Sequence, residues 1–341
     1  MKDFRGSLLI TLFCLIGAFF WGGWKGTIIA AILGVMEVSL SFDNAVVNAV
    51  KLKTMDNFWR KMFLTIGILI AVFGMRLLFP VVIVAIATGL GFKNVALLAI
   101  NNPTEYSKHL IASHTQISAF GGMFLLLVFL SFLFDDAREL HWLGKIEERL
   151  ARLGKLDMIA AIVALLTLLI LQRFLHPEER LGAMIAGVGG VVLFIAVDSL
   201  SSLFETEAEE ASQVQSAFRS GLTGLLYLEV LDASFSFDGV IGAFAITNDV
   251  VIIMLGLAIG AMFVRSMTVF LVRKGTLDEY VYLEHGAHYA IGALALIMLS
   301  SSVYQVPEIV TGLIGVAFIG VSLWSSIIYK RRNAGEFEVL R

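Results

Sequence analysis

The chain has only one cysteine and four prolines among its 341 residues, and charged residues make up 16% of it. Because Cys14 has no second cysteine to pair with, the sequence excludes an intrachain disulfide and a thiolate metal cluster. Lysine and arginine form no basic patch and the formal net charge is -3, so no nucleic-acid partner is expected. What the chain does have is apolar residues, which make up 58% of it and give a mean hydropathy of +0.86.

The apolar residues fall into runs that are long enough to cross a lipid bilayer, which takes roughly 20 residues in a helix. This pattern predicts an all-α polytopic membrane protein with about ten transmembrane helices. The spans are expected at residues 8–24, 27–50, 62–89, 116–134, 157–175, 182–203, 217–247, 250–272, 285–302 and 308–329. The third span contains Pro80, and residues 94–100 are apolar but too short to cross, so a kink or a re-entrant piece is expected there.

Lysine and arginine are distributed unevenly between the two sides of this arrangement. Eighteen of the 25 fall on the side that carries both termini, and five fall on the other side. Since cytoplasmic loops are enriched in these residues, both termini are expected in the cytoplasm. The membrane is expected to be a prokaryotic inner membrane. Residues 135–155, between the fourth and fifth spans, mix both charges with apolar residues at helical spacing, which favours an amphipathic segment on the membrane surface.

One short motif occurs twice. Ser39-Leu-Ser-Phe-Asp43-Asn44 reappears as Ser234-Phe-Ser-Phe-Asp238-Gly239, and an acid precedes each motif aspartate by six residues, as Glu37 and Asp232. The likeness continues downstream in the same order. The recurring pairs are Gly67 and Arg76 with Gly256 and Arg265, nine residues apart in each copy, and then Glu105 and His114 with Glu279 and His288, again nine apart.

These landmarks indicate an internal repeat that divides the chain into residues 1–155, with the connector, and residues 156–341. The two motif helices are the second and seventh expected spans. An odd displacement makes the second copy run through the membrane in the opposite sense. The sequence therefore predicts an inverted-topology repeat, an arrangement common among secondary transporters, whose binding sites lie where the two copies meet.

Acids inside lipid-length apolar runs are costly and usually functional. The predicted site has oxygen donors only: carboxylates, an amide, hydroxyls and backbone carbonyls. Such hard donors suit Mn²⁺, Mg²⁺ or Ca²⁺. On a continuous helix Glu37 and Asp43 would point about 240° apart, so their convergence requires both motif helices to unwind. The candidate metal ligands are Glu37, Asp43, Asn44, Glu229, Asp232 and Asp238.

Arg76 and Arg265 are expected as counter-charges or gating partners. Structural salt bridges to these arginines are the alternative role for the acids, but two cations cannot neutralise all the acids in the spans, Asp198 included. A bound divalent cation, protonation, or both would compensate the excess charge. Asp198 belongs either to the transport pathway or to a helix interface. His114 and His288 are either proton-relay residues or helix-end residues bonded to a neighbour.

The segments at 37–47 and 229–241 resemble the paired acidic motifs of the TerC family of integral membrane proteins, which includes the Alx-type transporters and carries a historical name for tellurium resistance. The resemblance implies Mn²⁺ export, with no tightly bound cofactor and with the motif acids as ligands. This sequence departs from the common second motif at Gly239, where a small hydroxyl residue is frequent, so no side-chain ligand is available there.

A transporter rather than an enzyme is thus the expectation. Two other classes stay open. One is an intramembrane enzyme that uses paired aspartates as acid and base, although the Gly-x-Gly-Asp motif of intramembrane aspartyl proteases is absent. The other is an accessory membrane component of a tellurite or stress-resistance system, in which the acids would be structural.

Overall fold

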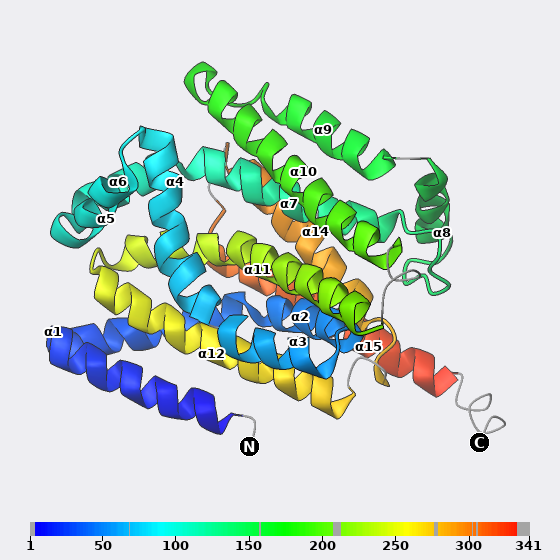
Figure 1. Cartoon of the computed structure of the whole chain (residues 1–341), viewed down its shortest axis with the longest axis horizontal. Helices are drawn as coiled ribbons and strands as arrows, with labels where there is room; N and C mark the ends of the chain where they lie inside the picture. Colours follow the sequence, from blue (N-terminus) through cyan, green and yellow to red (C-terminus); the bar gives the residue numbers. More distant parts are fainter. Residues whose placement is uncertain are drawn as a thin grey trace.

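The computed structural model describes residues 4–67, 69–156, 158–206, 213–275, 279–301, 303–304 and 306–332. All regular structure in these ranges is helical, and the long helices lie side by side in one bundle (Figure 1). The elements up to the connector are α1 (Arg5–Leu40), α2 (Phe42–Thr54), α3 (Asn57–Met62), the π-helical segments η1 (Phe63–Gly67) and η2 (Ile70–Leu78), α4 (Phe79–Thr88), α5 (Phe92–Asn101), α6 (Pro103–Ala112) and α7 (His114–Leu133).

The rest of the chain begins with two short helical segments and continues with long helices. These elements are α8 (Lys145–Ala151), the 3₁₀ segment η3 (Arg152–Lys155), α9 (Ile159–Leu171), α10 (Pro177–Thr206), α11 (Gln213–Ile246), α12 (Val250–Lys274), α14 (Leu283–Ser301) and α15 (Glu308–Arg332). α7 packs against both α10 and α14, and its residues are largely buried in the main apolar core.

Six described helical segments are long and apolar enough to cross a membrane, and the number rises to seven if the bent pair at Lys145–Lys155 and Ile159–Leu171 forms one span. The expected ten spans are therefore not confirmed. One reason lies in α1, which holds the first expected span and much of the second in one helix. Gly23 breaks it with a φ of 61°, a conformation that glycine adopts readily. The two arms fold back on each other, since a Cβ at Gly26 would lie 2.9 Å from the Ala18 carbonyl oxygen (Figure 1).

The two copies of the sequence repeat exchange packing partners. α1 and α2, which carry the first motif, pack against α12 of the second copy, and α11, which carries the second motif, packs against η2 of the first. α7 and α14, which carry the equivalent residues His114 and His288, pack against each other. Each motif helix is thus held by elements of both copies, which brings the two motifs together in the bundle.

The same exchange is visible at single residues. A Cβ at Gly34 would lie 3.4 Å from the carbonyl oxygen of Gly256. The equivalent positions in the other half are Glu229 and Gly67, and a Cβ at Gly67 would lie 2.6 Å from Glu229 Oε1. Small residues at these helix crossings let the backbones approach closely. The glycines shared by the two copies therefore mark where the copies cross.

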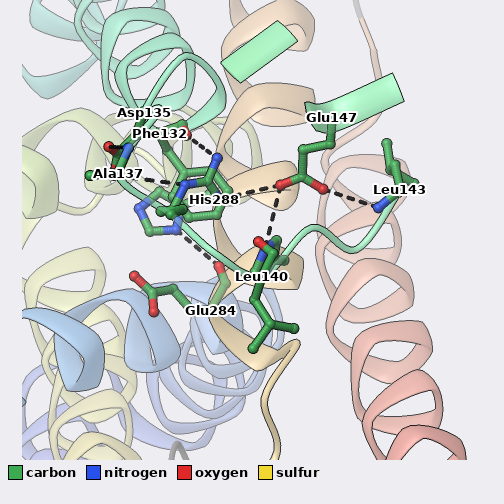
Figure 2. Close-up of polar contacts among 10 residues, drawn as sticks. Phe132, Asp135, Ala137, Leu140, Leu143, Glu147, Glu284 and His288 are labelled. Atoms are coloured by element: carbon green, nitrogen blue, oxygen red, sulfur yellow. Dashed lines mark hydrogen bonds and ion pairs between the residues drawn. The ribbon is translucent and has the colours of Figure 1, made fainter. Parts of the chain in front are cut away.

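The connector between α7 and α9 is attached to the bundle by one buried carboxylate. Glu147, on α8, is completely buried, and its Oε1 lies 3.2 Å from Arg138 Nη1 and 3.4 Å from His285 Nε2. Its other oxygen accepts a hydrogen bond from the Leu143 backbone N–H at 3.0 Å (Figure 2). His285 is buried at the start of α14, where its Nε2 donates to the Leu140 carbonyl oxygen at 2.9 Å.

Replacing Glu147 by alanine should lower the free energy of unfolding by about 3 kcal/mol, because it leaves the Arg138 side chain, which is only 15% exposed, without this partner. Glu148→Ala is the matched control, since Glu148 pairs with the exposed Arg152 and such surface pairs contribute about 0–1 kcal/mol. Thermal unfolding in detergent measures both. Equal losses in the two variants would contradict the assigned role of Glu147.

Candidate functional site

The first motif helix is broken at Ser41, between α1 and α2. Ser41 has φ -105° and ψ 19°, outside helical values, while its backbone N–H still donates to Glu37 O at 3.0 Å. Its hydroxyl donates to Glu37 Oε1 at 3.2 Å. The break therefore occurs at the predicted place, and it spans a single residue.

The predicted break in the second motif helix is wrong, because α11 is a continuous helix through the motif. Ser234 fits this helix since its hydroxyl donates to the carbonyl oxygen of Val230, one turn earlier, at 3.0 Å. The hydroxyl that suggested unwinding is thus satisfied inside regular helix. The side chain of Asp238 lies outside the described part of the structure.

Arg76 bridges the equivalent acids of the two copies. Its Nη2 donates to Glu37 Oε1 at 2.6 Å, and its Nη1 lies 3.6 Å from Asp232 Oδ2. All three side chains are buried. Arg76 belongs to η2, a π-helical segment, and its Nη1 also donates to the Ala71 carbonyl oxygen at 2.9 Å. π-Helical turns occur frequently at functional sites.

The Glu37 side chain lies in a narrow space beside Gly239 and Gly260 of the second copy. A Cβ at Gly239 would lie 2.5 Å from Glu37 Oε2, and a Cβ at Gly260 would lie 2.1 Å from its Cγ. Any side chain at either position would displace the carboxylate from Arg76. The structure thus gives a steric reason for the departure at Gly239.

A small cavity of about 30 Å³ lies beside Asp232, between the two copies. It is large enough for one water molecule or one small ion. Its lining comes from α2, η1, η2, α11 and α12. The lining residues are Asn48, Phe63, Gly67, Ala71, Glu229, Asp232, Ala261, Val264, Arg265 and Thr268.

Four buried oxygens of the lining residues have no hydrogen-bond partner within the described residues. They are Asn48 Oδ1, both carboxylate oxygens of Glu229, and Asp232 Oδ2. Arg265 Nε also has no hydrogen-bond partner there. Buried polar atoms nearly always find a partner in folded proteins, so this concentration of unsatisfied oxygens is the distinctive feature of the site.

Asp43 and Asn44 do not line the cavity. Asp43 is buried near α15, where a Cβ at Gly315 would lie 3.1 Å from its Oδ2, and its Oδ1 accepts the Asn44 backbone N–H at 3.1 Å. The Oδ1 of Asn44 is buried without a partner in the described ranges. Within those ranges no three Asp, Glu, His or Cys side chains form a metal-binding group. The structure thus brings Glu37, Asp232 and Glu229 near one another and places Asp43 apart from them.

The three remaining candidates lie outside the cavity lining. Asp198 is exposed on α10. His114 Nε2 lies 3.3 Å from the Ser118 hydroxyl, one turn along α7. His288 Nδ1 donates to the Glu284 carbonyl oxygen at 2.9 Å, and its ring stacks on Phe132 with the ring centres 3.9 Å apart (Figure 2). Both histidines thus have the local bonding expected of structural helix residues.

Comparison with known proteins places the chain in a family. The family described as "Protein of unknown function (DUF475)" matches residues 42–333. The chain belongs to this family. A stretch of 114 residues, 33% of this chain, is 32% identical to the uncharacterized membrane protein YceF of Bacillus subtilis (strain 168), of which it covers 43%. The chain thus spans less than half the length of this relative. No solved structure matches.

Together with the helices of membrane-spanning length, this relative identifies the DUF475 chain as a membrane protein. The resemblance to TerC and Alx-type proteins is not named by either match and stays a prediction.

Sequence reasoning missed Asn48 in this DUF475 protein. The residue lies four positions after Asn44 in the same apolar run, and its counterpart in the second copy is Ala243, so the repeat gave no signal. Polarity inside an apolar span is the signal that could have found it. The first copy has Gly34 at the position that Glu229 occupies in the second. A larger residue does not fit there, because a Cβ at Gly34 would lie 2.8 Å from the Ile259 side chain.

Gly239→Ala should destabilise the DUF475 protein by about 1–3 kcal/mol, because the added methyl group overlaps Glu37 Oε2. The control is Gly320→Ala on α15, where a Cβ meets nothing within 4 Å and alanine favours the helix. Thermal unfolding of the purified proteins compares them. A Gly239→Ala variant as stable as the control would show that Gly239 does not confine the Glu37 carboxylate.

Proposed function

We propose that this DUF475 membrane protein is a transporter that exports a divalent cation, with Mn²⁺ as the preferred substrate, through the site between its two repeated motifs. The observation that carries the proposal is the set of four buried oxygens from Asn48, Glu229 and Asp232 around one cavity. None of them has a hydrogen bond within the described residues, although Asp232 Oδ2 lies 3.6 Å from Arg76 Nη1. Carboxylate and amide oxygens are hard donors that favour Mn²⁺, Mg²⁺ and Ca²⁺ over softer metals. A cation in the cavity would satisfy all three side chains.

The charge of the site supports a divalent ion. The described acids Glu37, Asp43, Glu229 and Asp232 are buried, and Arg76 and Arg265 are the arginines that the repeat places beside them. Glu37, Glu229 and Asp232 against the two guanidinium groups leave one negative formal charge, and the buried Asp43, which lies apart from the cavity, adds a second. Uncompensated charge is unfavourable in a buried, low-dielectric site, and one divalent cation would compensate it. Asp238 is proposed as a further ligand from the resemblance of its motif to the TerC family.

Arg76 supplies a means of coupling ion binding to movement of the two copies. It holds Glu37 at 2.6 Å and reaches Asp232 only at 3.6 Å, so the bridge to the second copy is the weaker contact. A cation entering the cavity competes with Arg76 for Asp232. In this mechanism Arg76 keeps its bond to Glu37 and releases Asp232, which loosens one copy from the other. Arg265 lines the cavity and acts as the second counter-charge.

An inverted-topology repeat of residues 1–155 and 156–341 is part of the proposal. The exchange of partners between α1–α2 and α12, and between α11 and η2, is the pairing that a two-fold relation between the copies produces. Such repeats let one half rock against the other around a fixed site. The resemblance to the TerC and Alx-type proteins supports Mn²⁺ as substrate, export as direction, and an inner-membrane location with cytoplasmic termini.

Transport should collapse when the cavity acids lose their charge. In proteoliposomes loaded with Mn²⁺, we expect efflux to fall at least tenfold in Glu229→Gln and in Asp232→Asn. Asp198→Asn, on the exposed side of α10, should keep the wild-type rate. Wild-type protein that moves no Mn²⁺ would refute the transporter, and unaltered efflux in both cavity variants would refute the site.

Mn²⁺ should also raise the melting temperature of the detergent-purified protein, because a ligand that binds only the folded state stabilises it by about 2.7 kcal/mol at 100 times its Kd. Glu229→Gln should abolish the rise and Asn48→Ala should reduce it, while Asp198→Asn should keep it. An equal rise in all four proteins would mean that Mn²⁺ binds elsewhere.

A further inference from the structure

The connector segment Lys145–Lys155 lies across the direction of the apolar helix that follows it. The angle between this segment and α9 is 102°. α9 has no charged residue, and its Ile162 and Ile170 are half or more exposed. A helix with such an exposed apolar surface lies in the hydrocarbon region of a membrane protein. The near-right angle therefore places Lys145–Lys155 along the membrane surface.

The inward face of this segment is fixed by the bundle. Glu147 and Ala151 are buried, one turn apart on α8. The contacts of Glu147 with Arg138 and His285 prevent the segment from rolling about its axis (Figure 2). The faces that remain outward are therefore set by the fold.

The outward side of the segment has a stripe of exposed apolar residues beside a stripe of exposed basic residues. The residues of both stripes, named in the next two sentences, are called the connector surface. Leu143, Ile146, Leu153 and Leu156 are 41% to 65% exposed, and Met158, at the bend into α9, is 64% exposed. The basic residues Lys145, Arg149, Arg152 and Lys155 are also exposed, and the first three recur at helical spacing. This pairing of stripes is typical of helices that lie in the headgroup region.

We propose that the connector surface binds the headgroups of anionic phospholipids in the membrane that holds the protein. The charges favour anionic over neutral lipid. Glu147 pairs with Arg138 and Glu148 pairs with Arg152. Lys145, Arg149 and Lys155 have no ion pair among the described residues, which leaves three cations beside the apolar stripe. Their long side chains can reach phosphate groups while Ile146 and Leu153 enter the acyl region.

Continuity with α9 favours lipid over a soluble partner. Leu156 and Met158, at the bend, are exposed apolar residues, and the exposed Ile162 of α9 follows them, so apolar side chains are exposed on both sides of the bend. A soluble partner would have to cover the apolar side chains before the bend and stop at the bilayer. This inference is independent of which ion the protein carries.

A single fluorophore at the connector tests the proposal. Cys14→Ser removes the native cysteine, and Ile146→Cys then takes one label. The labelled protein is placed in nanodiscs of phosphatidylcholine and phosphatidylglycerol of constant composition. Two preparations are compared, in which a nitroxide quencher near the top of the acyl chain is carried by phosphatidylglycerol or by phosphatidylcholine, at equal mole fraction. We expect the phosphatidylglycerol quencher to be preferred by at least about fivefold, which is the effect of one cation near an anionic surface.

The variant Lys145→Gln, Arg149→Gln, Lys155→Gln should bring the preference to about one. The matched control, Lys93→Gln, Lys108→Gln, Arg173→Gln, removes the same charge outside the connector and should keep it. Added salt should weaken the wild-type preference by screening, which tests the charges without a substitution. Equal quenching by the two lipids, no quenching by either, or a preference that survives in the connector variant would each overturn the proposal.

Discussion

The arrangement of the site depends on one ion bridge, in which Arg76 holds Glu37 of the first copy and reaches Asp232 of the second. A guanidinium in an apolar bundle is tolerated only when carboxylates surround it, and carboxylates need a cation in the same way. The bridge thus fixes the relative position of the two motif helices. The cavity beside it, and the approach of Glu229 to Gly67, follow from that position.

The bridge also explains why the acids are not equivalent. Glu37 is enclosed by Gly239 and Gly260, and its Oε1 accepts hydrogen bonds from both Arg76 and Ser41. Glu229 has no such bond within the described residues and opens onto the cavity. The acids of one repeated motif can therefore serve two purposes: one positions the arginine, and the other is available to a ligand. This difference in bonding between Glu37 and Glu229 supports the proposed transport site.

Much of this could be predicted from the sequence. Composition identified a helical membrane protein, and the repeat placed Glu37 and Asp232 among the candidate site acids with Arg76 as a counter-charge. The continuity of α11 through the second motif and the count of spans could not be predicted. A serine hydroxyl bonds inside a helix as readily as outside it, as Ser234 does with Val230. Gly23 folds α1 into two arms at the boundary expected between the first two spans, so one long helix stands where two spans were expected.

The exchange of partners has a consequence for how such a chain can be divided. The glycine faces of α1 and α12, and of α11 and the Gly67 region, are complementary only across the two copies. The second copy standing alone would expose a seam of small residues and would hold the buried Asp232 without Arg76, which belongs to the first copy. The repeat boundary near residue 155 is therefore a feature of the sequence, and it does not separate two units that fold independently.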